Sequence, residues 1–177
     1  SKKMELHLYD RQIIHIAAAQ LDIGDLSEKN LKNLEENVEP YSLNFMPFYS
    51  FGTHSRPIDK ELFITEAKVI RKLAEDNSCI ILGRCADFVL QDLSNHYSFF
   101  ICADDIYREQ RGKSIYKGKS LKELKSEDKK RAKYYKFYTG EKWGNLENYD
   151  LVINTAKMSL EKAADLIIEY INLMKNK

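Results

Sequence analysis

The residues best suited to chemistry in this chain follow the short apolar run at 80–82, where Gly83, Arg84 and Asp87 stand close together. The run shows no alternation, which is typical of a strand buried on both faces in a parallel sheet covered by helices. In such sheets ligands lie just beyond the carboxyl ends of the strands. A glycine there lets the backbone turn tightly or approach a ligand closely. We therefore expect Arg84 and Asp87 to meet a ligand, although an arginine that pairs with a local carboxylate fits the same pattern.

Positive charge is concentrated in one segment of the chain. Residues 108–142 hold 13 Lys and Arg against 5 Asp and Glu, a balance of +8, whereas the whole chain sums to +1 and the remainder therefore to −7. A basic segment on an otherwise acidic body is the expected footprint of an anion-binding element. A solvated helical face explains several of these lysines equally well.

Length, composition and cysteine usage describe an ordinary globular protein. A chain of 177 residues suits one domain over 1–177 and can bury a real core. No apolar run approaches the roughly 20 residues of a membrane span, and the start shows no signal-peptide pattern. The lack of such a run predicts no membrane contact. The 3 cysteines have no metal-like spacing, so we expect no metal site and reduced thiols in a cytoplasmic protein. For Cys85, beside the candidate site, we expect a packing or site-lining role rather than an activated thiol.

Periodicity predicts strands that alternate with helices. The expected strands cover residues 8–10, 78–82, 96–102 and 150–154. The expected helices cover residues 11–19, 27–38, 59–74, 85–90 and 121–137, with one more from Asp104 and one after Ser159. This order implies an α/β domain with a parallel sheet. We also expect the end of a helix at 1–6 and a long aromatic loop at 41–57.

One acid lies on an otherwise apolar helical stripe. Val69, Ile70 and Leu73 share one face of the helix expected over 59–74, and Glu66 falls on the same face. Burying this carboxylate without a partner would be costly. Glu66 therefore lies either at the mouth of the site or against an arginine.

Several segments carry a recognisable pattern, namely residues 8–11, 81–90, 131–144 and 148–155. The most specific parts are Gly-Arg-Cys-Ala-Asp and Tyr-Tyr-x-x-Tyr-Thr-Gly. Together these segments resemble the cytidylate kinase-like family, a branch of the P-loop nucleoside monophosphate kinases, over nearly the whole chain. The resemblance implies a three-layer P-loop kinase-like α/β fold with a central parallel sheet flanked by helices. It also implies an acceptor-nucleotide-binding insertion over 20–60 and a basic helical lid over 103–142.

The resemblance implies four catalytic arginines, and they are Arg84, Arg108, Arg111 and Arg131. The planar fork of arginine matches phosphate oxygens. Arg84 would hold the phosphate or base of the acceptor nucleotide, and the other three would belong to the lid. A spacing of three puts Arg108 and Arg111 on one helix face. Asp128 stands three residues before Arg131, so an ion pair between these two is the alternative.

The expected substrate-binding residues are Asp10, Asp87, Tyr134 and Tyr135, together with Glu66 from its place on the helical stripe. Asp10 and Asp87 would contact the acceptor base, its ribose or a metal-bound water. Tyr134 and Tyr135 would stack on a base or donate a hydrogen bond to a phosphate. Core packing of the second lid helix explains the two tyrosines equally well.

The chain departs from the family pattern in one respect. It contains no Gly-x-x-x-x-Gly-Lys-Ser/Thr sequence, whose backbone N–H groups hold the β- and γ-phosphates. We expect the first strand and this loop to lie upstream of Ser1, and helix residues to be missing within the link at 4–6. The alternative is a relative that lacks the loop and is inactive.

These patterns together predict a nucleoside monophosphate kinase-like phosphotransferase that uses ATP with Mg²⁺ to phosphorylate CMP or a related monophosphate in the cytoplasm. Four arginines in one cleft need an anion to offset their repulsion, and the facing phosphates of the two nucleotides would supply it. Two alternatives stay open: an inactive kinase-fold scaffold or regulatory protein, and a nucleic-acid-binding module that uses the basic, Tyr-rich segment. The acidic remainder disfavours nucleic acid. The expected partners are nucleoside mono- and triphosphates, and homo-oligomers are compatible with the aromatic loop.

Overall fold

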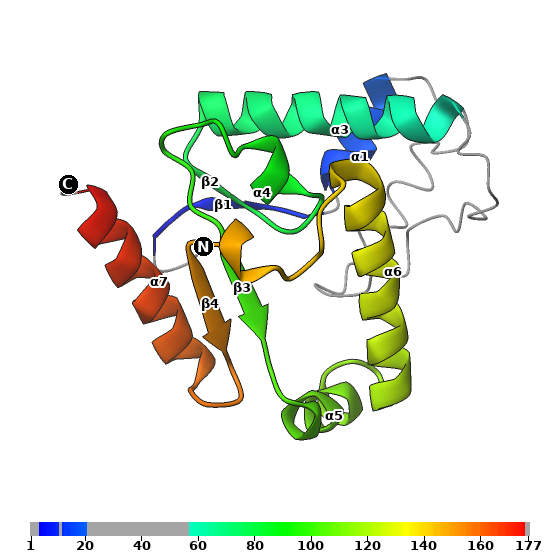
Figure 1. Ribbon diagram of the computed structural model, residues 1–177. Coiled ribbons are helices and arrows are strands. Elements are labelled where there is room, and N and C mark those ends of the chain that lie inside the picture. Colours follow the sequence, from blue (N-terminus) through cyan, green and yellow to red (C-terminus); the bar gives the residue numbers. More distant parts are fainter. Residues whose placement is uncertain (1–3, 11, 21–56, 176–177) are drawn as a thin grey trace. The chain divides into compact units, whose positions relative to one another are not determined.

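The computed structural model describes residues 4–10, 12–20 and 57–175, which fall into two units that divide between Asp92 and Leu93 (Figure 1). Each unit contains one pair of parallel strands together with its own helices. The chain is therefore mixed α/β, as predicted. The helix predicted over 27–38, the aromatic loop up to residue 56 and most of the predicted insertion over 20–60 lie outside the described residues.

The first unit brings the ends of two strands to one edge. Its elements are β1 (His7–Tyr9), α1 (Gln12–Gln20), α3 (Pro57–Asp76), β2 (Cys79–Ile81) and α4 (Ala86–Val89). β1 and β2 pair in parallel, with Tyr9 opposite Ile81. The N–H of Leu82 donates to the carbonyl of Tyr9 at 2.9 Å and continues the pairing. Asp10 and Gly83, which follow these strands, therefore leave the sheet at the same edge.

Two helices of this unit pack together through faces that are readable in the sequence. Ile13 and Ala17 stand four residues apart on α1 and are buried, as are Val69 and Ile70 on α3. Helices α1 and α3 lie in contact, so these side chains form one apolar core. Burial of each large aliphatic side chain contributes about 1.5–3 kcal/mol. This core supports the face of α3 on which Glu66 also lies.

The second unit contains the basic segment. Its elements are β3 (Phe99–Cys102), α5 (Asp105–Ser114), α6 (Leu121–Thr139), the short 3₁₀ helix η2 (Leu146–Asn148), β4 (Leu151–Asn154) and α7 (Leu160–Lys175). Helices α5 and α7 each begin at a single capping side chain. The Oδ1 of Asp104 accepts from the N–H of Tyr107 at 2.9 Å, and the Oγ of Ser159 accepts from the N–H of Lys162 at 3.3 Å. The predicted lid segment thus comprises α5 and α6, which pack against each other.

The strands β3 and β4 lie side by side in parallel, with Phe99 opposite Leu151 (Figure 1). Asp150 joins their starting ends, because the Ser98 N–H donates to its Oδ2 at 2.6 Å and its own N–H donates to the Ser98 carbonyl at 2.9 Å. The ring of Tyr170 on α7 meets the ring of Phe99 edge-on at 5.9 Å. Helix α7 therefore packs beside the first residue of β3.

Two expectations about local structure are wrong. Met4 and Glu5 form a turn rather than the end of a helix, and the φ of Glu5, 53°, is incompatible with a right-handed helix. The β2 residues are half-buried rather than buried on both faces. In the described part of the chain β2 belongs to a two-stranded sheet, so a neighbouring strand protects it on one side.

The three-layer arrangement, the single domain over 1–177 and the lid boundaries stay predictions. Across residues 4–10, 12–20 and 57–175, no helix is both long and apolar enough to cross a membrane.

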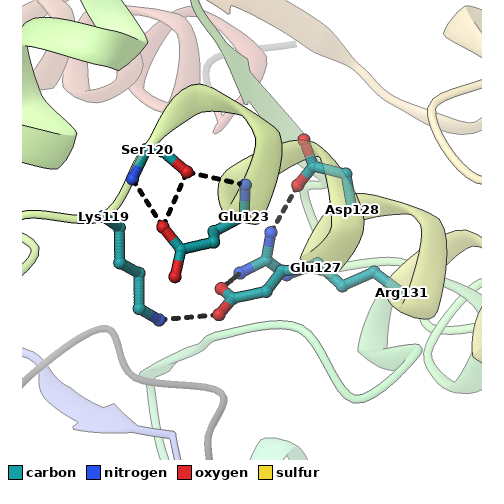
Figure 2. A network of polar contacts seen from close by, with 6 residues as sticks. All are labelled: Lys119, Ser120, Glu123, Glu127, Asp128 and Arg131. Carbon is teal, nitrogen blue, oxygen red and sulfur yellow. Dashed lines mark hydrogen bonds and ion pairs between the residues drawn. The ribbon is translucent and has the colours of Figure 1, made fainter.

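Helix α6 begins at a capping box, in which Ser120 and Glu123 each accept a hydrogen bond from the backbone of the other, at 3.3 and 2.8 Å (Figure 2). We expect Ser120→Ala to lower the free energy of unfolding by about 1 kcal/mol, measured by urea denaturation followed by circular dichroism. Ser126→Ala, at an exposed position of the same helix, is the matched control and should cost nothing measurable. Equal losses in the two variants would contradict this role of the cap.

The same capping box gives a pH dependence. Hydrogen bonds from Ser120 hold the pKa of the Glu123 carboxyl below its ordinary value. A lowered pKa in the folded state contributes stability at neutral pH, and that contribution is lost as pH falls through the pKa of the folded protein. The difference between wild type and Ser120→Ala should therefore shrink on acidification.

Candidate functional site

The turn after β2 is built from three consecutive residues with positive φ, which are Gly83 at 67°, Arg84 at 57° and Cys85 at 53°. This left-handed region suits glycine but costs other residues about 1–2 kcal/mol each. The N–H of Ala86 donates to the carbonyl of Gly83 at 3.0 Å and closes the turn. Such strain persists only where the surroundings hold it in place. The residue expected to meet a ligand therefore sits on a strained turn at the carboxyl end of a strand.

An ion pair with Glu66 holds Arg84 at this turn. The Nη1 of Arg84 lies 3.5 Å from the Oε1 of Glu66, and the two side chains are only 11% and 3% exposed. Glu66 comes from the buried face of α3, beside Ile70. Of the two alternatives for Glu66, the structure shows the one in which it packs against an arginine. The same contact shows that Arg84 pairs with a carboxylate, and its contact with a ligand stays a prediction.

Two further acids lie near the ends of the strands in this unit. Asp10 directly follows β1, and its N–H donates to the Oε1 of Gln12 at 3.0 Å. Asp87 stands in the first turn of α4, three residues after Arg84. Because β1 and β2 run parallel, both acids belong to segments that leave the sheet at one edge. Their contacts with a nucleotide or a metal-bound water stay predictions.

Cys85 is a packing residue of this turn. Its side chain is buried, and burial, followed by the charges of Asp87 and Glu66, raises the pKa of the thiol to about 12. The nearby guanidinium of Arg84 opposes this shift without reversing it. Because the thiolate is the reactive form, this raised pKa favours the packing role over an activated thiol.

In the second unit, one carboxylate bridges two of the predicted catalytic arginines. The Oδ1 of Asp128 accepts from the Nη1 of Arg131 at 2.5 Å, and its Oδ2 accepts from the Nη2 of Arg108. The first contact is the ion pair that the spacing of three indicated as the alternative to a catalytic role for Arg131. The second joins residues 20 positions apart and exists because α5 packs against α6. Sequence periodicity carries no signal for such a contact.

The bridge continues into a longer chain of charges, here named the α5–α6 network, which consists of Arg108, Asp128, Arg131, Glu127 and Lys119. The Nη2 of Arg131 lies 3.9 Å from the Oε2 of Glu127, whose Oε1 accepts from the Nζ of Lys119 at 2.6 Å. Figure 2 shows Arg131 reaching both carboxylates, with Lys119 at the far end. Positive and negative groups alternate, so each carboxylate is shared by two cations.

Arg111 makes contacts of another kind. Its guanidinium carbon lies 5.7 Å from the ring centroid of Tyr107 and 5.8 Å from that of Tyr116, within the range of cation–π contacts. Its carbonyl accepts from the N–H groups of Ile115 and Tyr116 and ends α5. A side-chain carbon at the next residue, Gly112, would lie 2.3 Å from the carbonyl oxygen of Lys119. Arg111 thus stabilises the tight connection between the helices, and its catalytic role stays a prediction.

The two tyrosines of the predicted substrate set make contacts with protein. Tyr135 is buried, and its hydroxyl accepts from the Nδ2 of Asn148 at 3.3 Å. The ring of Tyr134 packs against that of Tyr138 at 4.6 Å between centroids. Core packing, the alternative left open for these residues, therefore describes Tyr135. Base stacking by Tyr134 stays a prediction.

The rest of the tyrosine-rich motif shapes the return of the chain from α6 to β4. Gly140, at φ 77°, ends α6 in the left-handed conformation. At Gly144 a side-chain carbon would come within 3.2 Å of the Phe100 ring, so the backbone approaches β3 closely. Trp143 and Tyr149 pack on the same ring at 5.4 and 4.9 Å. The contacts of this segment in the structure are thus mainly packing contacts within the protein.

The sequence did not single out Asn148 as a site or packing residue, although it begins the Asn-Tyr-Asp pattern. Besides its contact with Tyr135, its Nδ2 donates to the Oε2 of Glu141. The polar chain joins the end of α6 to η2, just before β4. Within the ranges that the structure describes, no three His, Cys, Asp or Glu residues are grouped to hold a metal ion. Convergence of the four arginines on one cleft stays a prediction, since Arg84 belongs to one unit and the others to the second.

Comparison with known proteins decides the family. The sequence model of the cytidylate kinase-like family matches residues 1–157. The chain belongs to the cytidylate kinase-like family. The resemblance recognised in the sequence is thereby confirmed, and membership of this family indicates a kinase-like protein with nucleotide substrates.

One solved structure similar to this cytidylate kinase-like chain is the crystal structure of an uncharacterized protein from Eubacterium ventriosum ATCC 27560. The two chains are 27% identical with a TM-score of 0.67, and the match covers 97% of this chain and 86% of that one. A search of curated proteins gave no match. The similarity supports the fold.

The buried ion pair of this cytidylate kinase-like chain can be tested against an exposed one. Glu66→Gln leaves the Arg84 charge buried without its counterion, so we expect the free energy of unfolding to fall by about 3 kcal/mol in urea denaturation. Asp92→Asn is the matched control, because the Arg71–Asp92 pair has side chains 40% and 61% exposed and should contribute nothing measurable. Wild-type stability in Glu66→Gln would show that Arg84 does not depend on Glu66.

The raised pKa of Cys85 predicts its reactivity. At pH 8 about one thiol in 10,000 would be ionised, so iodoacetamide should leave Cys85 unmodified in the folded protein. The small alkylation rate should rise about tenfold per pH unit from pH 7 to pH 10, whereas an ordinary cysteine levels off above about pH 8.5. Mass spectrometry of the digested protein measures both, with urea-unfolded protein as the control. Equal labelling of folded and unfolded protein would contradict the buried, protonated thiol.

Proposed function

We propose that this protein is a phosphotransferase that moves the γ-phosphoryl group of ATP to a nucleoside monophosphate, with CMP or a related monophosphate as the acceptor. The observation that carries the proposal is an arginine, Arg84, fixed at the carboxyl end of a parallel strand in a chain of a kinase-like family. Ligands of open α/β sheets bind at this position. The arginines of α5 and α6 supply the further positive charge that such a reaction needs.

Phosphoryl transfer asks a protein chiefly to position phosphates and to offset developing negative charge. In this proposal Arg84 binds the phosphate of the acceptor, with its direction set by Glu66 and by the strained turn. Arg108 and Arg131 stabilise the charge on the group in transfer. Their side chains are 25% and 33% exposed, so part of each is accessible to a ligand while it is held in the α5–α6 network.

ATP would bring Mg²⁺, which prefers oxygen ligands and keeps most of its coordination for phosphates and water. Asp10 and Asp87 carry carboxylate oxygens, and both lie in segments that leave the sheet of the first unit at one edge. They therefore fit a contact with water bound to that ion. When bound, the ion would neutralise charge on the β- and γ-phosphates. The residues of this chain would orient the acceptor and hold the arginines.

An assay of the full-length protein with ATP, Mg²⁺ and each common ribo- and deoxyribonucleoside monophosphate tests the proposal. We expect ADP together with the diphosphate of the acceptor, and the highest kcat/KM with a pyrimidine monophosphate. Formation of no diphosphate from any acceptor would remove the kinase function and favour an inactive kinase-fold scaffold.

Arg84→Lys tests the residue that carries the proposal. Lysine keeps the charge beside Glu66 but lacks the planar fork, so we expect kcat/KM to fall about 100-fold without unfolding. Arg71→Lys, in the exposed pair with Asp92, is the matched control and should leave kcat/KM unchanged. If Arg84→Lys keeps full activity in an active enzyme, Arg84 is not the residue that binds the acceptor phosphate.

A further inference from the structure

The α5–α6 network holds two arginines side by side without help from a ligand. Arg108 on α5 and Arg131 on α6 each contact a different oxygen of the Asp128 carboxylate. The two oxygens of one carboxylate are close together, so the two guanidinium groups that contact them are also close to each other. Like charges at such a distance repel each other, and the shared carboxylate offsets this repulsion.

The geometry of these contacts differs from that of a bidentate arginine–carboxylate pair. A carboxylate that neutralises one arginine accepts two parallel hydrogen bonds from the same fork. Asp128 instead gives one oxygen to each arginine, through a single terminal nitrogen of each. The arrangement fixes the separation of two guanidinium groups without enclosing either one.

The rest of the network holds Arg131 from its other side. Glu127 lies next to its Nη2, and Glu127 is itself fixed by Lys119. The network contains three cations and two carboxylates, so it keeps a net charge of +1. Removal of Asp128 would leave three cations with one carboxylate, and their repulsion would drive Arg108 and Arg131 apart.

We propose that Asp128 is a positioning residue, which holds Arg108 and Arg131 at a fixed separation as one paired receptor for phosphate groups. The inference rests on the proposed function, because it takes phosphates to be the anions that these arginines meet. It adds that the receptor is assembled before the ligand arrives, which reduces the ordering cost of binding. Asp128 itself touches no substrate in this scheme and acts through the two arginines.

The direction in which anion affinity changes when the Asp128 charge is removed separates a positioning role from simple electrostatic repulsion of the anion. Loss of a negative charge near an anion site strengthens binding if the carboxylate only competes with the anion. Loss of a positioning carboxylate weakens binding, because the arginines then have to be ordered by the ligand. The chain offers a matched control in Asp105, which joins α5 to α6 through the Nζ of Lys125 at 2.5 Å and contacts neither Arg108 nor Arg131 in the described contacts.

The experiment measures binding of inorganic pyrophosphate to the full chain by calorimetry at about 0.15 M salt, where long-range charge effects are screened. We expect Asp128→Asn to weaken binding about tenfold, the size of one lost hydrogen bond to a charged group. Asp105→Asn changes the net charge equally and should bind as wild type does or slightly more tightly. Asp128→Glu restores the carboxylate one methylene further out, so its affinity should lie between those of Asp128→Asn and wild type.

Binding by Asp128→Asn that equals or exceeds wild type would overturn the inference, as would equal losses in Asp128→Asn and Asp105→Asn. If Asp128→Asn does not fold at the assay temperature, Asp128→Glu carries the test, and wild-type affinity in that variant overturns the inference. A wild-type protein that binds no pyrophosphate also overturns it. The transfer assay judges the proposed function separately, since diphosphate formation does not depend on pyrophosphate affinity.

Discussion

Neutralisation of arginine charge by helix-borne carboxylates is the interaction on which the candidate site depends. Arg84 can occupy a strained turn because Glu66, on the buried face of α3, lies against it. Arg108 and Arg131 can stand side by side because Asp128 accepts from both. In each case the acid comes from a helix whose own packing fixes its position. The packing of these helices therefore determines where the guanidinium groups of the arginines lie.

This interaction changes the argument from charge. From the sequence alone, arginines gathered in one cleft require an anion from a ligand, and two nucleotides would supply it. Within the second unit the chain supplies anions of its own, since Asp128 and Glu127 are shared among Arg108, Arg131 and Lys119. Repulsion among arginines therefore no longer implies a bound phosphate. Support for phosphoryl transfer rests instead on family membership and on the place of Arg84 at the end of β2.

The site also shows two uses of residues that look alike in the sequence. Among the lid arginines, Arg108 and Arg131 pair with carboxylate, whereas Arg111 packs on the rings of Tyr107 and Tyr116 and stabilises the turn between α5 and α6. The tyrosine-rich motif likewise serves mainly the packing of α6 on the chain leading to β4. Residue type and helical spacing show which side chains share a face. The partner that each one meets depends on what packs against that face.

The sequence by itself determined the order of strands and helices in the described residues, the start of α5 at Asp104, the start of α7 after Ser159 and the family, because each depends on short-range spacing. It also indicated the Asp128–Arg131 pair as one of two alternatives, since both lie on one helix. The tertiary structure decided which alternative holds for Glu66, that Asp128 also binds Arg108, and that Tyr135 belongs to the core. These contacts join residues 13 to 20 positions apart, and they form only when one helix packs against another element. Local sequence sets the faces of the elements, whereas packing between elements decides which charges meet.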